Sequence, residues 1–184
     1  MEPIRELIAV DLEMTGLQVK TDRILEIGAV RLVDGQLRDT FQTFVNPHRR
    51  IDARITELTG IRPEMVEDAP EAEEALRKFL EFAGEAPFLG HNVIFDYSFL
   101  KQCAVNHKIS LERSALDTLK IARKVLKEPE KKSLEALCGY FQIDREHAHR
   151  AVDDAKATAE LFLMLQQKYQ QQEPGLFVPK PLHY

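Results

Sequence analysis

The stretch Leu7-Ile8-Ala9-Val10-Asp11-Leu12-Glu13-Met14-Thr15-Gly16 places two carboxylates directly after an apolar run. In a β-strand, residues two positions apart point to the same face, so Asp11 and Glu13 project side by side from the end of a buried strand. Two carboxylates this close repel each other unless a proton or a cation lies between them. Hard divalent cations such as Mg²⁺ and Mn²⁺ prefer oxygen ligands, so the pair indicates a metal site. The segment alone fits equally well a strand end at which Asp11 caps a turn and Glu13 is solvated.

Two later segments contain residues suited to the same site. Gly90-His91-Asn92-Val93-Ile94-Phe95-Asp96 follows an apolar stretch and precedes a helix expected over residues 97–105. Asp96 therefore lies at a strand-to-helix junction, where an acid is favoured whether it binds a metal or only caps the helix. The segment His147-Ala148-His149-Arg150-Ala151-Val152-Asp153-Asp154 leads into a long helix expected over residues 155–170. A histidine beside carboxylates and a metal can act as a general base, although a histidine at a helix start is commonly a solvated surface residue.

Helical phase distinguishes the two neighbouring aspartates at the start of the long helix. Steps of three and four residues from Asp154 reach Thr158, Leu161 and Leu165, which form a mostly apolar face that should point inward. The same steps from Asp153 reach a mixed and solvated face. Asp154 is therefore the predicted ligand, and His149 is expected on the loop or first turn leading into the helix.

Taken together, these segments resemble one family. The runs Asp11-Leu12-Glu13, His91-Asn92-x-x-Phe95-Asp96 and His149-x-Ala151-x-x-Asp154 are similar, in order and spacing, to the three motifs of the DnaQ-like (DEDDh) 3′–5′ exonucleases. The resemblance extends over roughly residues 7–165 and includes the apolar strand at residues 24–30 and the Leu116-Asp117-Thr118-Leu119 segment. Three motifs in register are much more specific than one. Within the family, the chain is most similar to the proofreading subunit or exonuclease domain of bacterial DNA polymerase III.

The resemblance implies a ribonuclease-H-like α/β fold, with a central mixed β-sheet flanked by helices, and a phosphodiesterase that uses two Mg²⁺ or Mn²⁺ ions. Asp11, Glu13, Asp96 and Asp154 would be the metal ligands. His149 would deprotonate the water that attacks the 3′-terminal phosphodiester, and the product would be a nucleoside 5′-monophosphate. The residues expected near the terminal nucleotides are Met14, Thr15, Gly16, Thr59, His91, Asn92 and Phe95. For Thr59, ending a short helix before Gly60 is an equally good interpretation, and Phe95 fits a core position better than a stacking platform.

The motifs leave two nucleic-acid substrates open, DNA and RNA. The first motif has Leu12 and Met14, a version that also occurs in oligoribonucleases, so RNA 3′-end trimming is an alternative to cleavage of single-stranded DNA ends. A second alternative is a noncatalytic module that binds nucleic acid or a polymerase. Degenerate modules usually lack one or more acidic residues, whereas all four are present here. The net charge of −5 argues against tight nonspecific nucleic-acid binding, but not against an enzyme that holds a few terminal nucleotides.

The 184 residues are enough for one domain with a real core, expected over residues 1–170. Further expected strands cover residues 6–13, 24–34, 38–46 and 86–90, with a hairpin turn at Asp34-Gly35. Further expected helices cover residues 52–58, 72–82, 117–126 and 133–141. Residues 171–184 are expected to form an extended C-terminal tail, because prolines prevent the last helix from continuing.

Three expectations concern partners and location. The run from Gln171 to Leu176-Phe177 loosely resembles the Gln…Leu-Phe peptide that docks bacterial replication proteins on a sliding clamp, although Pro174 stands where an aliphatic residue is expected. A DNA polymerase and a single-stranded 3′ end are the other expected partners. With no apolar run of membrane-spanning length and no signal-like N-terminus, a cytoplasmic protein without a membrane partner is expected. Cys103 and Cys138 lie in apolar helical patterns and are expected to be buried thiols.

Overall fold

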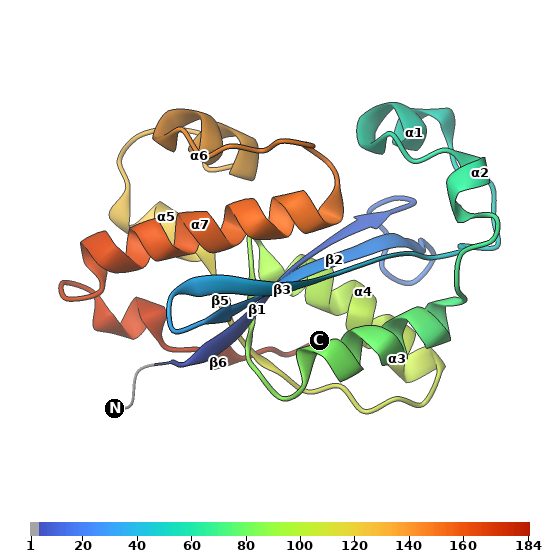
Figure 1. Ribbon diagram of the computed structural model, residues 1–184, viewed down its shortest axis with the longest axis horizontal. Coiled ribbons are helices and arrows are strands. Elements are labelled where there is room, and N and C mark those ends of the chain that lie inside the picture. Colours follow the sequence, from blue (N-terminus) through green and yellow to red (C-terminus); the bar gives the residue numbers. More distant parts are fainter. Residues whose placement is uncertain (1–3) are drawn as a thin grey trace.

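The computed structural model describes residues 4–184, in which a central six-stranded sheet has helices on both faces (Figure 1). The strands lie in the order β3-β2-β1-β4-β5-β6. They are β1 (Glu6–Met14), β2 (Ile24–Val33), β3 (Gln36–Phe44), β4 (Phe88–Gly90), β5 (Ser114–Asp117) and β6 (Lys180–Pro181). The helices are α1 (Ala53–Thr59), α2 (Pro63–Val66), α3 (Ala72–Ala83), α4 (Val93–Asn106), α5 (Thr118–Val125), α6 (Leu134–Phe141) and α7 (Ala151–Tyr169), with a 3₁₀ turn η1 (Pro174–Phe177).

The sheet is mixed, as predicted. Strand β1 is antiparallel to β2 and parallel to β4, and β4 is parallel to β5. The first three strands form a meander whose second turn is the predicted Asp34-Gly35 hairpin. Both turn residues have positive φ angles, 50° and 79°, and Val33 pairs directly with Gln36. This is the two-residue geometry whose twist matches that of the flanking strands.

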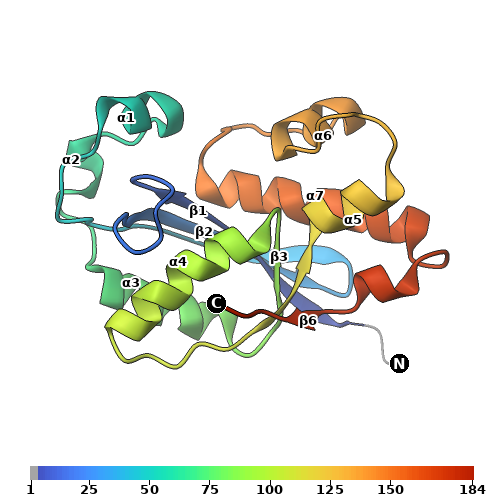
Figure 2. The ribbon, with the colours of Figure 1, turned by 180° about the vertical axis from the view of Figure 1, so that it is seen from behind.

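Strand β1 separates two cores by alternation of its side chains. Ile8, Val10 and Leu12 belong to the core under α3 and α4, and Leu7 and Ala9 to the core under α5, α6 and α7. Views from opposite sides show these two helical layers on the two faces of the sheet (Figures 1 and 2). By the same alternation, the two carboxylates at the end of β1 share the face of Leu7 and Ala9, which is covered by α7.

Helices α4 and α7 both begin four residues earlier than the sequence pattern predicts, at Val93 and Ala151. Asp96 and Asp154 are therefore each the fourth residue of a helix, not residues that precede one. Both carboxylates lie in the first turn, where the partial positive charge of the helix end is felt most strongly. Two strands, β5 and β6, were not predicted, because runs of four and two residues contain too little alternation to be recognised.

The segment after α7 is more compact than the extended tail expected for residues 171–184. Its 3₁₀ turn η1 buries Phe177, whose ring lies 6.0 Å from that of Phe162 on α7. Lys180 and Pro181 then pair with β5 at the edge of the sheet. The prolines do stop the helix, as predicted, but the chain turns back because a large apolar side chain gains free energy by entering the core.

The remaining expectations concern membrane-spanning helices and the two cysteines. Within residues 4–184, no helix combines the length and apolar character needed to cross a membrane. Both cysteines are free thiols: Cys138 is buried and Cys103 is partly buried. Burial raises the pKa of each thiol to about 11, so both are protonated and unreactive at neutral pH.

Candidate active site

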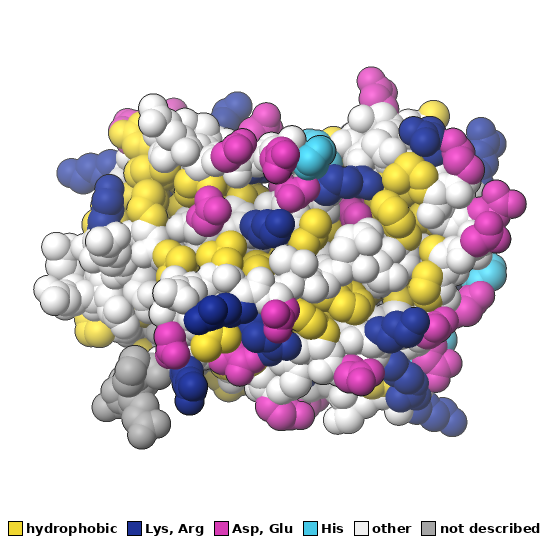
Figure 3. All heavy atoms as spheres, in the orientation of Figure 1, with side chains coloured by type: hydrophobic (Ala, Val, Ile, Leu, Met, Phe, Trp, Pro, Cys, Tyr) yellow, Lys and Arg dark blue, Asp and Glu magenta, His cyan; other side chains and the backbone are white. Residues whose placement is uncertain are grey.

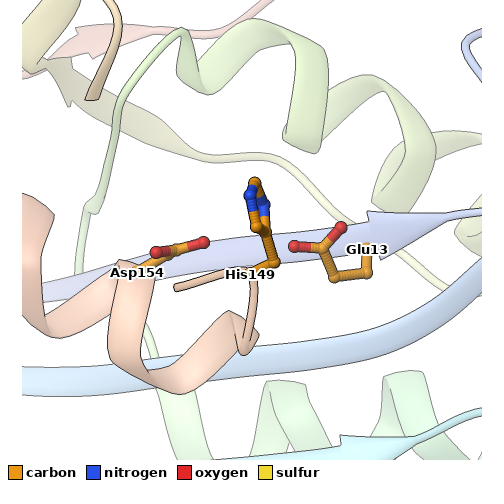
Figure 4. Close-up of side chains that lie close together, drawn as sticks. All are labelled: Glu13, His149 and Asp154. Atoms are coloured by element: carbon orange, nitrogen blue, oxygen red, sulfur yellow. The ribbon is translucent and has the colours of Figure 1, made fainter. Parts of the chain in front are cut away.

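Three of the predicted site residues lie together at the carboxyl end of β1. Glu13, His149 and Asp154 each offer one ligand atom, and these atoms all lie within 4.8 Å of one another. Figure 4 shows the His149 imidazole standing between the two carboxylates, with Glu13 on the strand and Asp154 at the start of α7. Residues separated by 136 positions or more in the sequence are thus brought within reach of a single ion.

The other two predicted ligands lie against the same end of β1. Asp96 is buried, and its Oδ1 accepts a hydrogen bond of 3.1 Å from the backbone amide of Leu12, the residue between Asp11 and Glu13. Burial raises the pKa of Asp96 to about 7, although this hydrogen bond acts in the opposite direction. The contact fixes the first turn of α4 to β1 at Leu12, between Asp11 and Glu13.

Burial and mutual repulsion raise the pKa values of the strand carboxylates. Desolvation is the largest cause for Asp11, whose pKa lies well above its usual value, followed by the charges of Asp96 and Glu13. Desolvation and the charge of Asp154 raise the pKa of Glu13 to about 8. A dense set of carboxylate oxygens that is unfavourable without a counterion fits hard divalent cations such as Mg²⁺ or Mn²⁺.

Arg145 is a neighbour of the site that the sequence did not reveal. It lies on the loop before α7, and its Nε and Nη2 atoms donate hydrogen bonds of 3.0 and 2.9 Å to Oδ1 of Asp154. The side chains of this ion pair are only 12% and 7% exposed. Both contacts go to one oxygen, and a carboxylate can place its second oxygen on a cation.

The helical-phase argument for the two neighbouring aspartates agrees with the structure. Asp154 is buried, whereas Asp153 is partly exposed and its carboxylate lies 3.4 Å from Nδ1 of the exposed His147. His149 lies on the loop before α7 in the left-handed backbone region, with φ of 71°. The space-filling view shows acidic, basic and histidine side chains gathered on the surface over the start of α7 (Figure 3).

The start of α4 is held by Asp117, the last residue of β5. Its carboxylate accepts hydrogen bonds from the backbone amides of Asn92 (2.9 Å), Val93 (3.2 Å) and Leu119 (2.9 Å). Asp117 therefore caps α5 and also holds the turn that begins α4, three residues before Asp96. The sequence does not predict this contact of Asp117, because only the fold brings its carboxylate to the start of α4.

His91 and Asn92 occupy the turn between β4 and α4. Both ring nitrogens of His91 have partners within the chain: Nδ1 lies 2.8 Å from the Thr118 hydroxyl, and Nε2 lies 2.6 Å from the Lys132 carbonyl. Burial lowers the pKa of His91, which favours the neutral ring. Asn92 is exposed, with a φ of 65°. Of the two, Asn92 has the side chain that is open to a ligand.

The turn after β1 contains three of the expected substrate contacts. Met14 is half-buried against the core beneath α3 and α4. The Thr15 hydroxyl donates to the Asp22 carboxylate (2.9 Å) and accepts from the Arg23 amide (2.9 Å). A Cβ atom on Gly16 would lie 2.4 Å from an oxygen of the same carboxylate, so a side chain here would require the Asp22 side chain to move. Thr15 and Gly16 thus shape the loop that follows β1.

The last two expected contacts, Thr59 and Phe95, both have partners within the chain. The buried Thr59 hydroxyl donates to the Ile55 carbonyl (2.7 Å) and accepts from the Ile61 amide (3.1 Å), which ends α1 before Gly60 in the left-handed conformation. This matches the alternative interpretation of Thr59. The Phe95 ring packs edge-on against Phe99, with ring centroids 5.4 Å apart, at the border of the core.

Comparisons with known proteins show the family to which the chain belongs. Residues 8–162 match the RNase T family of exonucleases. The chain belongs to this exonuclease family, which confirms the predicted DnaQ-like exonuclease at the level of the family.

The similar sequences are parts of much longer proteins. The chain is 45% identical over 166 residues to a PolC-type DNA polymerase III of Caldanaerobacter subterraneus, covering 90% of the chain and 12% of the polymerase. It is 37% identical over 161 residues to the PolC-type DNA polymerase III of Bacillus subtilis, covering 86% of the chain and 11% of the polymerase. The chain thus spans only about one eighth of the length of these relatives.

Two solved structures show the same fold. Exonuclease X in complex with 5′ overhanging duplex DNA superimposes with a TM-score of 0.75 at 25% identity, covering 94% of this chain and 99% of that one. The nuclease domain of 3′hExo, a DEDDh family member bound to rAMP, superimposes with a TM-score of 0.79 at 19% identity, covering 96% of each chain. These likenesses confirm the predicted ribonuclease-H-like fold.

Proposed function

We propose that this chain is a divalent-metal-dependent 3′–5′ exonuclease that releases nucleoside 5′-monophosphates from single-stranded ends, with DNA as its preferred substrate. The proposal rests mainly on the convergence of Glu13, His149 and Asp154 within 4.8 Å at the strand end that also carries Asp11 and meets Asp96. Family membership supports the reaction class, and the PolC-type relatives support DNA and a polymerase context.

Asp11, Glu13, Asp96 and Asp154 would hold two Mg²⁺ or Mn²⁺ ions. Such a pair would supply charge stabilisation to the attacking and leaving oxygens of an in-line displacement. The four carboxylates offset the positive charge of the ions and keep it at the end of β1. Their repulsion in the metal-free chain gives this region a high affinity for cations.

His149 would accept the proton of the attacking water. Its imidazole stands between the Glu13 and Asp154 carboxylates, where it can take up the proton of a water held at the site. Because His149 lies on the loop before α7, small movements of that loop can align the ring with the water. Met14 and Asn92 are the expected neighbours of the terminal nucleotide, since both lie beside the ligands and neither side chain is fully buried.

On the same grounds, we propose that this chain acts together with a DNA polymerase, in the cytoplasm. The proofreading form of the proposal predicts that a mismatched 3′ end on a primer–template is removed faster than a matched end, because the mismatched end frays into a single strand. A sliding clamp is disfavoured as a partner of residues 171–177, because the Phe177 side chain that would dock is only 2% exposed.

The test is a time course on 5′-labelled single-stranded DNA and RNA of equal sequence, with Mg²⁺, with Mn²⁺ or with chelator. Asp154→Asn, purified in parallel, controls for contaminating nucleases. We expect a metal-dependent ladder that shortens from the 3′ end and advances faster on DNA. Faster cleavage of RNA would favour the oligoribonuclease-like alternative. Folded protein that binds metal but cleaves neither substrate would contradict the proposed exonuclease activity.

A further inference from the structure

The start of α7 rests on the strand next to the metal-binding strand. In the antiparallel pair of β1 and β2, Gly28 lies directly opposite Asp11, and Glu26 directly opposite Glu13. A Cβ atom on Gly28 would lie 2.1 Å from the backbone nitrogen of Val152. Because that contact is with backbone, a side chain here would push the helix away from the sheet. The helix start is therefore seated directly beside the carboxylates of β1.

Glu26 holds the seated helix by a specific hydrogen bond. Its side chain is only 1% exposed, and Oε1 accepts a hydrogen bond of 3.0 Å from the backbone amide of Ala151, the first residue of α7. Its Oε2 accepts a hydrogen bond of 2.9 Å from Nε2 of Gln42 on β3. A buried carboxylate is unfavourable unless it has such partners, and a helix amino terminus is a favourable place for it. Glu26 thus joins β3, β2 and α7.

Arg150 completes the attachment from the other side. Its Nη1 lies 3.9 Å from Oε2 of Glu26, and its Nη2 donates a hydrogen bond of 2.5 Å to the Thr59 carbonyl at the end of α1. Its guanidinium also lies over the ring of Phe44, 5.6 Å from the centroid. Arg150 is the residue between His149 and the helix, so holding it limits where the His149 ring can lie.

We propose that Glu26 is a positioning residue, which sets the places of His149 and Asp154 relative to Glu13 by fixing the first turn of α7 on β2. Gly28 allows the backbone of α7 to approach β2 closely, and the hydrogen bond from Ala151 to Glu26 keeps it there. The inference rests on the proposed function, because the geometry being set is that of the proposed metal site. Glu26 itself touches the helix and not the substrate.

The main test compares Glu26→Ala with Glu26→Gln in the full chain. We expect Glu26→Ala to lower the affinity for Mn²⁺, measured by calorimetry without nucleic acid, by about 10–100-fold, as is typical when a partner that orients metal ligands is lost. Hydrogen exchange of the amides at residues 151–154 should become faster. The turnover rate should fall, whereas the KM for the oligonucleotide should stay nearly unchanged. Glu26→Gln keeps an oxygen that can accept from the Ala151 amide, so it should recover most of the affinity.

A second variant tests independently whether the first turn of α7 must lie close to β2. Gly28→Ala should weaken Mn²⁺ binding and speed the same amide exchange, because the new Cβ must displace the helix backbone. Gly139→Ala on α6 is the matched control, since a Cβ there meets nothing within 4 Å, and it should bind Mn²⁺ as the wild type does. Gly28→Ala also keeps the proposal testable if Glu26→Ala does not fold.

The outcomes separate this inference from the proposed function. Folded Glu26→Ala and Gly28→Ala that bind Mn²⁺ as tightly as the wild type, with unchanged exchange, would overturn the positioning role. A Glu26→Gln as impaired as Glu26→Ala would also overturn it, because charge and not the hydrogen bond would then be what matters. A wild type that binds Mn²⁺ but cleaves no nucleic acid would contradict the exonuclease, and the binding and exchange data would still decide the role of Glu26.

Discussion

At the scale of single residues, the end of β1 concentrates carboxyl groups that raise one another's pKa. Glu13 reaches a pKa of about 8, and Asp96 one of about 7. Such groups retain protons at neutral pH until a cation displaces them, so metal binding and deprotonation are coupled. Asp11 and Glu13 should therefore be replaceable without loss of the metal-free fold.

Asp154→Asn should reduce turnover by at least about 100-fold, because loss of a ligand removes several kcal/mol of charge stabilisation and each 1.4 kcal/mol is worth tenfold in rate. The variant loses one of several repelling carboxylates, but it also loses the charge partner of Arg145. The thermal midpoint of the metal-free variant reports whether the fold is intact. The measurement is the initial rate on labelled single-stranded DNA. Asp153→Asn is the matched control on the adjacent, partly exposed residue and should keep near wild-type activity. Equal activity of Asp154→Asn and wild type would remove Asp154 from the site.

His149→Ala should lower the turnover rate by about 10²–10⁴-fold, the usual contribution of a general base. Part of the loss should be recovered as the pH rises, because hydroxide then replaces the water that needs a base. The measurement is a pH–rate profile from pH 6 to about 9. His147→Ala, two residues away and exposed, should follow the wild-type profile. A profile for His149→Ala that shows no loss of turnover rate at any pH would exclude His149 as the general base.

At the scale of elements, α4 and α7 each carry a proposed metal ligand at the same position, the fourth residue of the helix. The start of α4 depends on Asp117, whose carboxylate serves three backbone amides. Asp117→Ala leaves these amides without their partner, at a cost of about 1–3 kcal/mol for each group that stays buried and unpaired. We expect a larger loss of unfolding free energy than for Asp52→Ala at the exposed cap of α1, where about 1 kcal/mol is usual. Denaturant unfolding in chelator measures both variants, and equal losses would contradict the role given to Asp117.

The sequence predicted those parts of the elements that depend on local patterns. Strand alternation placed Asp11 and Glu13 together, helical phase separated Asp154 from Asp153, and the Asp34-Gly35 turn needed only its two residue types. The starts of α4 and α7 were placed too late, because the turns that begin them are held by contacts with other strands. These contacts, made by Glu26 and Asp117, join residues far apart in the chain, and no local pattern reveals such pairs.

At the scale of the whole molecule, the raised pKa values make stability depend on pH. The pKa of Glu13 rises from 4.5 to about 8 on folding, so between these values the folded chain holds a proton that the unfolded chain has released. Stability of the metal-free protein should therefore fall as the pH rises through this window. Thermal unfolding in chelator between pH 5 and about 9 measures the effect. Glu13→Gln should flatten the dependence, and a midpoint that rises with pH over this range would contradict the prediction.

The central claim is that the carboxylates at the end of β1 form a binding site for two divalent cations. The most direct measurement is calorimetric titration of the metal-free chain with Mn²⁺ near pH 7, in buffers of different ionisation enthalpy. We expect two bound ions per chain, with release of protons from the carboxylates whose pKa values are raised, and weaker binding with fewer ions in Asp11→Asn. Absence of binding, or binding without proton release that Asp11→Asn leaves unchanged, would contradict it.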